Sequence, residues 1–179
     1  YQTAFRFPAV SDQWFDIFTG RFQVVGGLPQ VQRKYNFNTV PLFPLSGSNP
    51  ITDVPVTENG PFEIPEFGPE KVTATEIGYR GLFLNNALMI DASIYQNVYN
   101  GFLALQNLVQ FPGEPNEMRF QTTISTDDPL TAYGWSFGAD MLLPGKFLLR
   151  TNVNYNALES LADRPPGFES RFNTPDYLF

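Results

Sequence analysis

The chain has 179 residues, a net charge of −7, and neither cysteine nor histidine. The negative charge argues against a nucleic-acid partner, and the missing residue types exclude disulfides, the usual zinc sites and any Ser-His or Cys-His catalytic pair. Charged residues make up only 16% of the chain, against about 25% in a typical soluble domain.

The N-terminal part of the sequence predicts one strand followed by a long connection. Residues 1–8 have the character of a strand that is already under way. Proline then recurs from Pro8 to Pro69, and proline is excluded from central strands because it cannot donate a ladder hydrogen bond. We therefore expect a strand near 1–8 and a long loop over 9–69.

The middle and the end of the sequence predict two long hairpins. Strands are expected at 70–83 and 87–100, joined by a short turn, and again at 131–143 and 146–158 around Pro144 and Gly145. In the strand at 87–100, apolar and polar side chains alternate, which is the period-two signal of a strand with two different faces. A last strand is expected at 175–179.

Long and short connections alternate along the chain. The expected loops 9–69, 101–130 and 159–174 are long, whereas the turns inside the hairpins are about three residues. Outer-membrane barrels combine short periplasmic turns with long extracellular loops, and strands of about 9–11 residues cross a bilayer. The pattern favours a membrane barrel over a soluble barrel or sandwich, which would bury the apolar face.

Several motifs resemble those of TonB-dependent outer-membrane receptors. The segment Pro69-Glu70-Lys71-Val72 is followed by EIGYRGLF at 76–83 and by LMIDASIYQNVYNGF at 88–102, in the order seen in that family. AFRFP at 4–8 resembles the end of a preceding strand, and FNTP at 172–175 resembles the start of a late one. The variants are most similar to receptors of the Bacteroidetes type.

The resemblance implies an all-β fold: an antiparallel transmembrane β-barrel segment, part of a 22-strand barrel, with long extracellular loops. We expect residues 1–179 to be a late part of such a barrel, without the plug domain or the segment that contacts TonB. The motif positions expected to serve the barrel wall are Phe5, Arg6, Pro8, Pro69, Glu70, Glu76, Gly78, Tyr79, Gly81, Asp91, Tyr95 and Tyr99.

The same resemblance implies nutrient uptake across the outer membrane of a Gram-negative cell. The expected partners are membrane lipid, the plug domain, the TonB complex, a siderophore, glycan, peptide or cobalamin ligand, and a surface lipoprotein. Two alternatives stay open: a secreted β-sandwich that binds glycans through loop aromatics, and a passive porin.

Aromatic residues in the first long loop are the candidate ligand contacts, because aromatic rings bury large areas at a modest entropic cost. Trp14, Phe15, Tyr35 and Phe37 lead this group. The alternative is that these rings pack the loop into a small domain on the barrel mouth.

Carboxylates give no clear catalytic or metal site. Asp127 and Asp128 are adjacent, but nothing places two acids across a cleft as glycoside hydrolysis requires. Acidic loop residues could bind calcium, yet their spacing matches no calcium loop, so solvated charge is the simpler interpretation. We expect no enzymatic activity, no cofactor and no metal.

Overall fold

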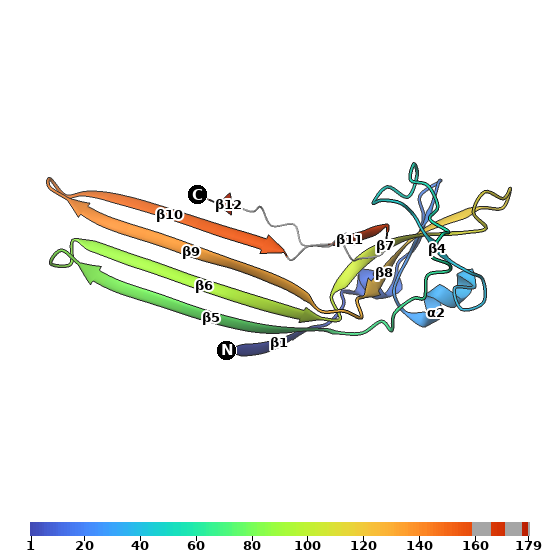
Figure 1. Ribbon diagram of the computed structural model, residues 1–179, viewed down its shortest axis with the longest axis horizontal. Helices are drawn as coiled ribbons and strands as arrows, with labels where there is room; N and C mark the ends of the chain where they lie inside the picture. Colours follow the sequence, from blue (N-terminus) through green and yellow to red (C-terminus); the bar gives the residue numbers. More distant parts are fainter. Residues whose placement is uncertain (159–165, 171–176, 179) are drawn as a thin grey trace.

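The computed structural model describes residues 1–158, 166–170 and 177–178, and it contains two sheets (Figure 1). The long sheet has the order β1-β5-β6-β9-β10-β12 and is antiparallel throughout. Its strands are β1 (Gln2–Arg6), β5 (Glu70–Phe83), β6 (Leu88–Asn100), β9 (Leu130–Leu143), β10 (Phe147–Leu158) and β12 (Tyr177–Leu178).

The small sheet lies beyond one end of the long strands, and with its helices it forms what we call the outer domain. Its order is β11-β7-β8-β3-β2, with β4 on β7, and β3 pairs with β8 in parallel. The strands are β2 (Asp16–Phe18), β3 (Gln23–Val25), β4 (Phe43–Pro44), β7 (Leu103–Gln110), β8 (Met118–Ser125) and β11 (Phe168–Ser170). The helices are α1 (Val10–Trp14), α2 (Pro29–Gln32) and the 3-10 turn η1 (Arg33–Tyr35).

The register of the long sheet sorts side chains into an apolar and a polar face. Ile77 pairs with Ile94, which pairs with Trp135 on β9. One register step away, these apolar ladders give way to ladders of polar and small residues, as the two-residue period of a strand requires. Ile77 and Ile94 are 70% and 60% exposed, so no second sheet formed by the described residues covers the apolar face.

The short turns of the long sheet adopt left-handed backbone conformations. Leu84, Asn85 and Asn86 all have positive φ between β5 and β6, and Gly145 and Lys146 have positive φ between β9 and β10. Asparagine and glycine tolerate this region better than other residues, which suits Asn85, Asn86 and Gly145 to these turns, whereas Leu84 and Lys146 adopt it beside them. These turns lie at the end of the long sheet opposite the outer domain.

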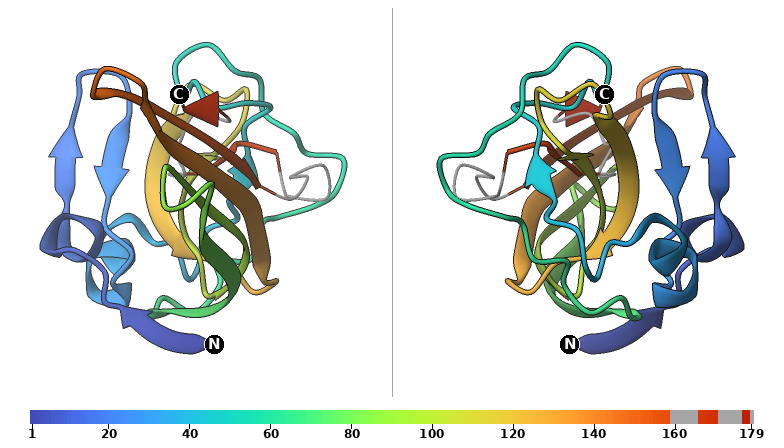
Figure 2. Two further views of the ribbon diagram at one scale, coloured as in Figure 1. Left: turned by 90° about the vertical axis from the view of Figure 1, so that its left-hand side faces the viewer. Right: turned by 90° about the vertical axis from the view of Figure 1, so that its right-hand side faces the viewer.

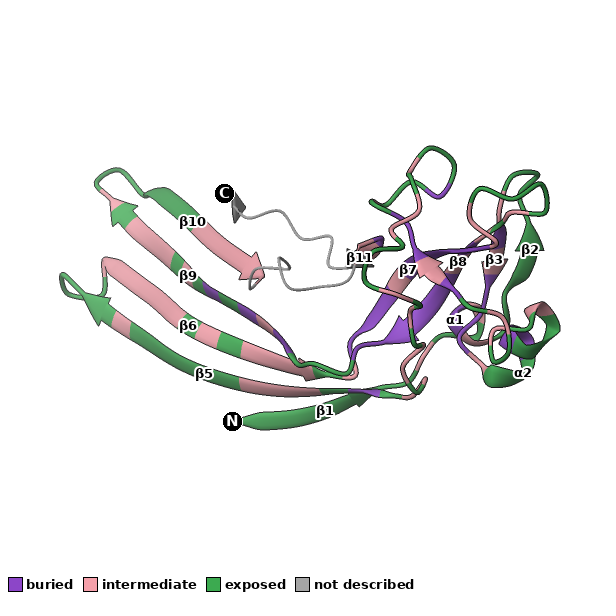
Figure 3. Cartoon of the chain, turned by 45° about the vertical axis from the view of Figure 1, so that its right-hand side comes forward, coloured by how far each residue is buried: buried purple, intermediate pink, exposed green. Residues whose placement is uncertain are grey.

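The buried core lies in the outer domain, as the purple strands in Figure 3 show. One cluster centres on Phe120 and Leu108, and another on Phe102 and Ile124. Phe62 and Ile64 are among the partly buried residues that pack against both clusters. Seen along the long axis in Figure 2, the β2–β3 hairpin stands at one side of this domain.

The expected loops 9–69 and 101–130 are folded rather than structureless. Helix α1, strands β2 to β4 and helix α2 lie in the first segment, and the β7–β8 hairpin lies in the second. Strand β7 is buried at seven of its eight positions, so its sequence lacks the alternation that marks a half-buried strand. Most of the expected loop 159–174, with residues 175, 176 and 179, lies outside the described residues.

Candidate functional site

The base of the outer domain is tied to the long sheet by Glu70. Glu70 lies on β5 with its side chain 3% exposed, and its Oε2 lies 2.8 Å from Nη2 of Arg6 on β1. The same oxygen accepts a hydrogen bond of 3.2 Å from the backbone N–H of Leu103, the first residue of β7. One carboxylate therefore joins three strands where the two sheets meet.

The four candidate ligand-contact aromatics occupy different environments in the outer domain. Trp14 ends α1 and is 55% exposed, and Phe15 follows it with 45% exposure. Tyr35 and Phe37 are half-buried, and their rings meet Phe120 edge-on at centroid distances of 5.6 and 4.9 Å. Trp14 and Phe15 are thus open to a ligand, whereas Tyr35 and Phe37 also support the core.

A polar cluster around Asp16 holds one of these four aromatics, Tyr35, by its hydroxyl. The Asp16 carboxylate accepts hydrogen bonds from Lys34 Nζ at 2.7 Å, from Gln23 Nε2 at 2.8 Å and from the Tyr35 hydroxyl. The bond from Lys34 is the main reason that the pKa of Asp16 is lowered. Burial, reinforced by the hydrogen bond to Asp16, raises the pKa of Tyr35 to about 12.

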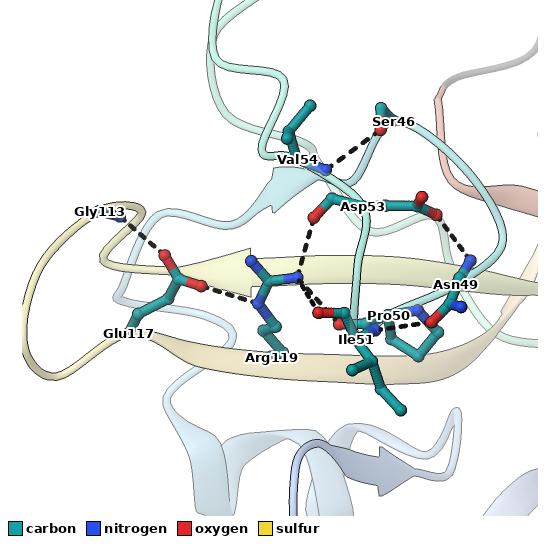
Figure 4. Close-up of polar contacts among 9 residues, drawn as sticks. All are labelled: Ser46, Asn49, Pro50, Ile51, Asp53, Val54, Gly113, Glu117 and Arg119. Carbon is teal, nitrogen blue, oxygen red and sulfur yellow. Dashed lines mark hydrogen bonds and ion pairs between the residues drawn. The ribbon is translucent and has the colours of Figure 1, made fainter.

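Arg119 clamps an outer loop onto the β7–β8 hairpin (Figure 4). Its Nη1 donates to three backbone carbonyls of residues 50–53, the shortest being 2.8 Å to Asp53. Its Nε donates to Glu117 Oε1 at 2.7 Å, and Glu117 Oε2 accepts from the Gly113 N–H at 2.8 Å. The Gly113 bond is the largest cause of the lowered pKa of Glu117.

The polar face of the long sheet carries cross-strand ion pairs. Arg80 binds Asp91, with its Nε 2.7 Å from Oδ2, and Arg150 Nε lies 3.0 Å from Asp140 Oδ2. Open hollows of about 600 and 340 Å³ lie along this face, the first lined partly by Glu76 and the second by both carboxylates of the ion pairs. The polar face is therefore charged and open to solvent, and no other described part of the chain covers it.

Three further motif positions, Tyr79, Gly81 and Tyr95, take part in close packing of a tyrosine over a glycine. Tyr95 lies over Gly134, its cross-strand partner on the polar face. On the apolar face, Tyr79 lies over Gly81, two residues along the same strand. In each case a Cβ on the glycine would collide with the tyrosine, so these glycines make room for rings.

The remaining motif positions have simpler environments. Phe5 lies on β1 opposite Lys71 and is exposed, and Gly78 faces Ser93 across the β5–β6 pair. The Tyr99 ring meets Phe102 edge-on at a centroid distance of 5.7 Å and packs against the core cluster around Phe102 and Ile124. Pro8 and Pro69 lie just beyond β1 and just before β5, where their missing N–H groups do not interrupt a ladder.

The acidic residues of the outer domain do not converge. Within residues 1–158 and the other described positions, no group of three or more acidic side chains is placed to hold a metal ion. Asp127 and Asp128 are exposed in the turn after β8, while Asp53 caps its own loop by accepting from the Asn49 N–H at 2.6 Å. Asp53 therefore serves local structure and not a metal site.

The sequence analysis missed a hollow of about 590 Å³ in the outer domain. It lies between residues 37–42 and 61–67, with Gln32 of α2 among its lining residues. Its walls are proline and phenylalanine side chains, and its polar lining includes Arg33, Glu63 and Glu66. No motif marks these residues, because they come from three separate stretches that only the fold brings together.

Comparison with known families decides which kind of sheet this is. A family model described as "TonB dependent receptor-like, beta-barrel" matches residues 1–179. The chain belongs to this family. A search of curated proteins and a search of solved structures each gave no match. Among the described residues, no helix is long and apolar enough to cross a membrane.

Family membership explains the two faces of the long sheet. TonB-dependent receptors lie in the outer membrane of Gram-negative cells, where the outer surface of a barrel meets lipid and its interior is polar. The uncovered apolar ladders through Ile77 and Ile94 suit the lipid side, and the ion-paired face suits the interior. The same uncovered face argues against the soluble sandwich alternative.

Proposed function

We propose that this chain forms part of the wall and the mouth of a receptor that binds a scarce nutrient outside the cell and imports it with TonB-derived energy. The observation that carries the proposal is the combination of a family barrel sheet with a folded outer domain whose exposed rings face solvent. A passive porin shares the sheet but has no need of such a domain.

The barrel interior has a matching role in the proposal. The polar face, with the Arg80–Asp91 and Arg150–Asp140 pairs, would contact the plug domain of the complete receptor. Movement of the plug by TonB would then open a path for the nutrient. The Bacteroidetes type and a surface lipoprotein partner belong to the same proposal, and the exposed strand β2 is a surface on which such a partner could rest.

The binding step is tested with exposed aromatic side chains rather than with a deletion. Removing residues 16–66 would take Val25, Leu42 and Phe62 out of the clusters around Phe120, so the rest of the domain would lose its core. Trp14→Ala and Phe15→Ala instead remove exposed rings. If these rings contact the nutrient, each change weakens binding by about tenfold or more, as for central aromatic contacts in other interfaces.

The matched control is Phe7→Ala, because Phe7 is also exposed, at 77%, but lies between β1 and α1 outside the candidate group. Energy use is tested by measuring uptake with and without a collapsed proton gradient. Binding that survives while uptake stops supports the proposal. Uptake that continues at the same rate indicates a passive pore, and equal binding by all variants excludes the two rings as contacts.

A further inference from the structure

The hollow in the outer domain is bounded by two stretches of chain outside the regular strands. Residues 37–40 form a turn and a bend, residues 41–42 and 61–67 are irregular, and every residue of 37–42 and 61–67 lines the hollow. A regular strand that faced a cavity with one side would contribute alternate residues, so these stretches present main chain as well as side chains. The Phe62 N–H donates to the Leu42 carbonyl at 2.7 Å, which joins the two stretches at one point.

Gln32 supplies an unused donor to this hollow. Its side chain is 8% exposed, and Nε2 is buried without a hydrogen-bond partner among the described residues. A buried donor without a partner costs free energy that folding must offset. A ligand that places a carbonyl or hydroxyl oxygen against Nε2 would remove that cost, which is a reason for the glutamine to be there.

The backbone along 61–67 has further hydrogen-bond donors that are not used by the described residues. The N–H groups of Glu63, Ile64 and Glu66 have no hydrogen-bond partner among the residues that the structure describes. Pro61 and Pro65 supply none, which keeps this stretch from joining a continuous ladder. Residues 61–67 form no strand of their own, but free main-chain N–H groups are what an extended peptide bonds to when it adds alongside a protein segment.

The side chains of the hollow also suit a peptide. Phe37, Phe62 and Phe67 with four prolines form apolar walls, and Arg33, Glu63 and Glu66 offer both signs of charge. None of these three charges forms an ion pair with another described residue. The volume of about 590 Å³ falls within the range of small-ligand sites, roughly 300–1,000 Å³.

We propose that the hollow binds a short extended peptide between residues 37–42 and 61–67, with Gln32 Nε2 donating to one of its carbonyls. The main-chain N–H groups of residues 63, 64 and 66, unpaired among the described residues, favour a peptide over a glycan, because the carbonyls of an extended peptide can accept from them in succession. The inference rests on the proposed function in one respect: the peptide would be the imported nutrient.

The test uses the complete receptor in detergent and two probe pools. One pool holds random hexapeptides with acetylated N-termini and amidated C-termini, and the other holds linear hexasaccharides. Bound probes are recovered and identified by mass spectrometry, and affinities of the retained peptides are measured by calorimetry. We expect the receptor to retain peptides, and Gln32→Met to weaken their binding about tenfold, the effect of losing one hydrogen bond of about 1.4 kcal/mol.

Gln32→Met separates binding from folding. Methionine has a similar length and removes the unpartnered donor, so the thermal midpoint of the outer domain should stay the same or rise. The matched control is Gln30→Met, because Gln30 lies on the same helix, is exposed and does not line the hollow. It should leave both peptide affinity and thermal midpoint unchanged.

Each other outcome overturns the inference without deciding the proposed function. No retained peptide, retention of hexasaccharides instead, or equal affinity in the Gln32→Met variant would each show that the hollow is not a peptide site. If peptides bind but uptake does not depend on the proton gradient, the inference stands and the TonB mechanism fails. If another nutrient is imported with energy and no peptide binds, the reverse holds.

Discussion

Replacing Glu70 by glutamine should loosen the base of the outer domain without unfolding the long sheet. The change keeps the side-chain shape and removes the charge that faces Arg6 and the Leu103 N–H. A hydrogen bond to a charged group contributes roughly 1.5–3 kcal/mol and a neutral one roughly 0.5–1.5 kcal/mol. The N–H bond therefore loses about 1 kcal/mol.

The ion pair adds a smaller amount to this loss. The Arg6 side chain is 54% exposed although Glu70 is buried, so solvent screens the pair and about 1 kcal/mol is an upper value. The total of about 1–2 kcal/mol corresponds to a factor of roughly 5–30 in the population of the locally opened state. Amide hydrogen exchange of a peptide covering the start of β7 should accelerate by that factor in the Glu70→Gln receptor.

A second variant distinguishes this explanation from a general loss of stability. Arg80→Met breaks the ion pair with Asp91. The Arg80 side chain is 72% exposed, and exposed ion pairs contribute little to stability. It should leave exchange at the start of β7 unchanged. If exchange in Glu70→Gln stays within twofold of the unmodified receptor, the carboxylate does not hold the junction and the reasoning fails.

Three further changes test other parts of the structure. Gly134→Ala should block barrel assembly in membranes, because its Cβ would collide with the Tyr155 carbonyl, whereas Gly138→Ala meets nothing closer than 3.8 Å and should assemble normally. Arg119→Met removes the bonds to three loop carbonyls and should increase protease cleavage within residues 46–56, with no change elsewhere. Because the pKa of Tyr35 is raised to about 12 from about 10 in an unfolded chain, its contribution to stability is complete below pH 10 and disappears as the pH rises through 12. Absorbance titration should show a late tyrosine step whose amplitude falls by one tyrosine in Tyr35→Phe; a late step of unchanged amplitude would contradict the assignment.

The strands of the long sheet could be predicted from sequence because each has two different environments. Lipid on one side and a wet interior on the other impose strict alternation, as between Ile90 and Asp91. The outer-domain strands have no such signature. Gln106 and Asn107 on β7 are both fully buried, and a buried polar pair inside a strand resembles a loop when only the sequence is read.

The candidate sites divide in the same way. Glu70 stands out in the sequence because it belongs to a motif, but its bond to Leu103 depends on where β7 begins. Gln32 carries no signal in the sequence, since it is one of two glutamines in the short segment PQVQ at 29–32 and no motif sets it apart from Gln30. Gln32 becomes a candidate contact only because Nε2 is buried beside the hollow without a partner among the described residues. That burial depends on how distant segments pack together, and no local sequence pattern predicts it.

The position of Phe62 and Ile64 has a consequence for how this receptor could change its specificity. Both residues line the hollow and both pack on each of the two clusters, so the lining of the hollow and the core of the outer domain share these side chains. The sequences of binding loops usually vary freely because the loops do not form the core of the scaffold that positions them. Here part of the lining of the hollow is also core. We therefore expect a change of ligand specificity at this hollow to come from exchanges of Glu63 and Glu66, with Phe62 and Ile64 kept.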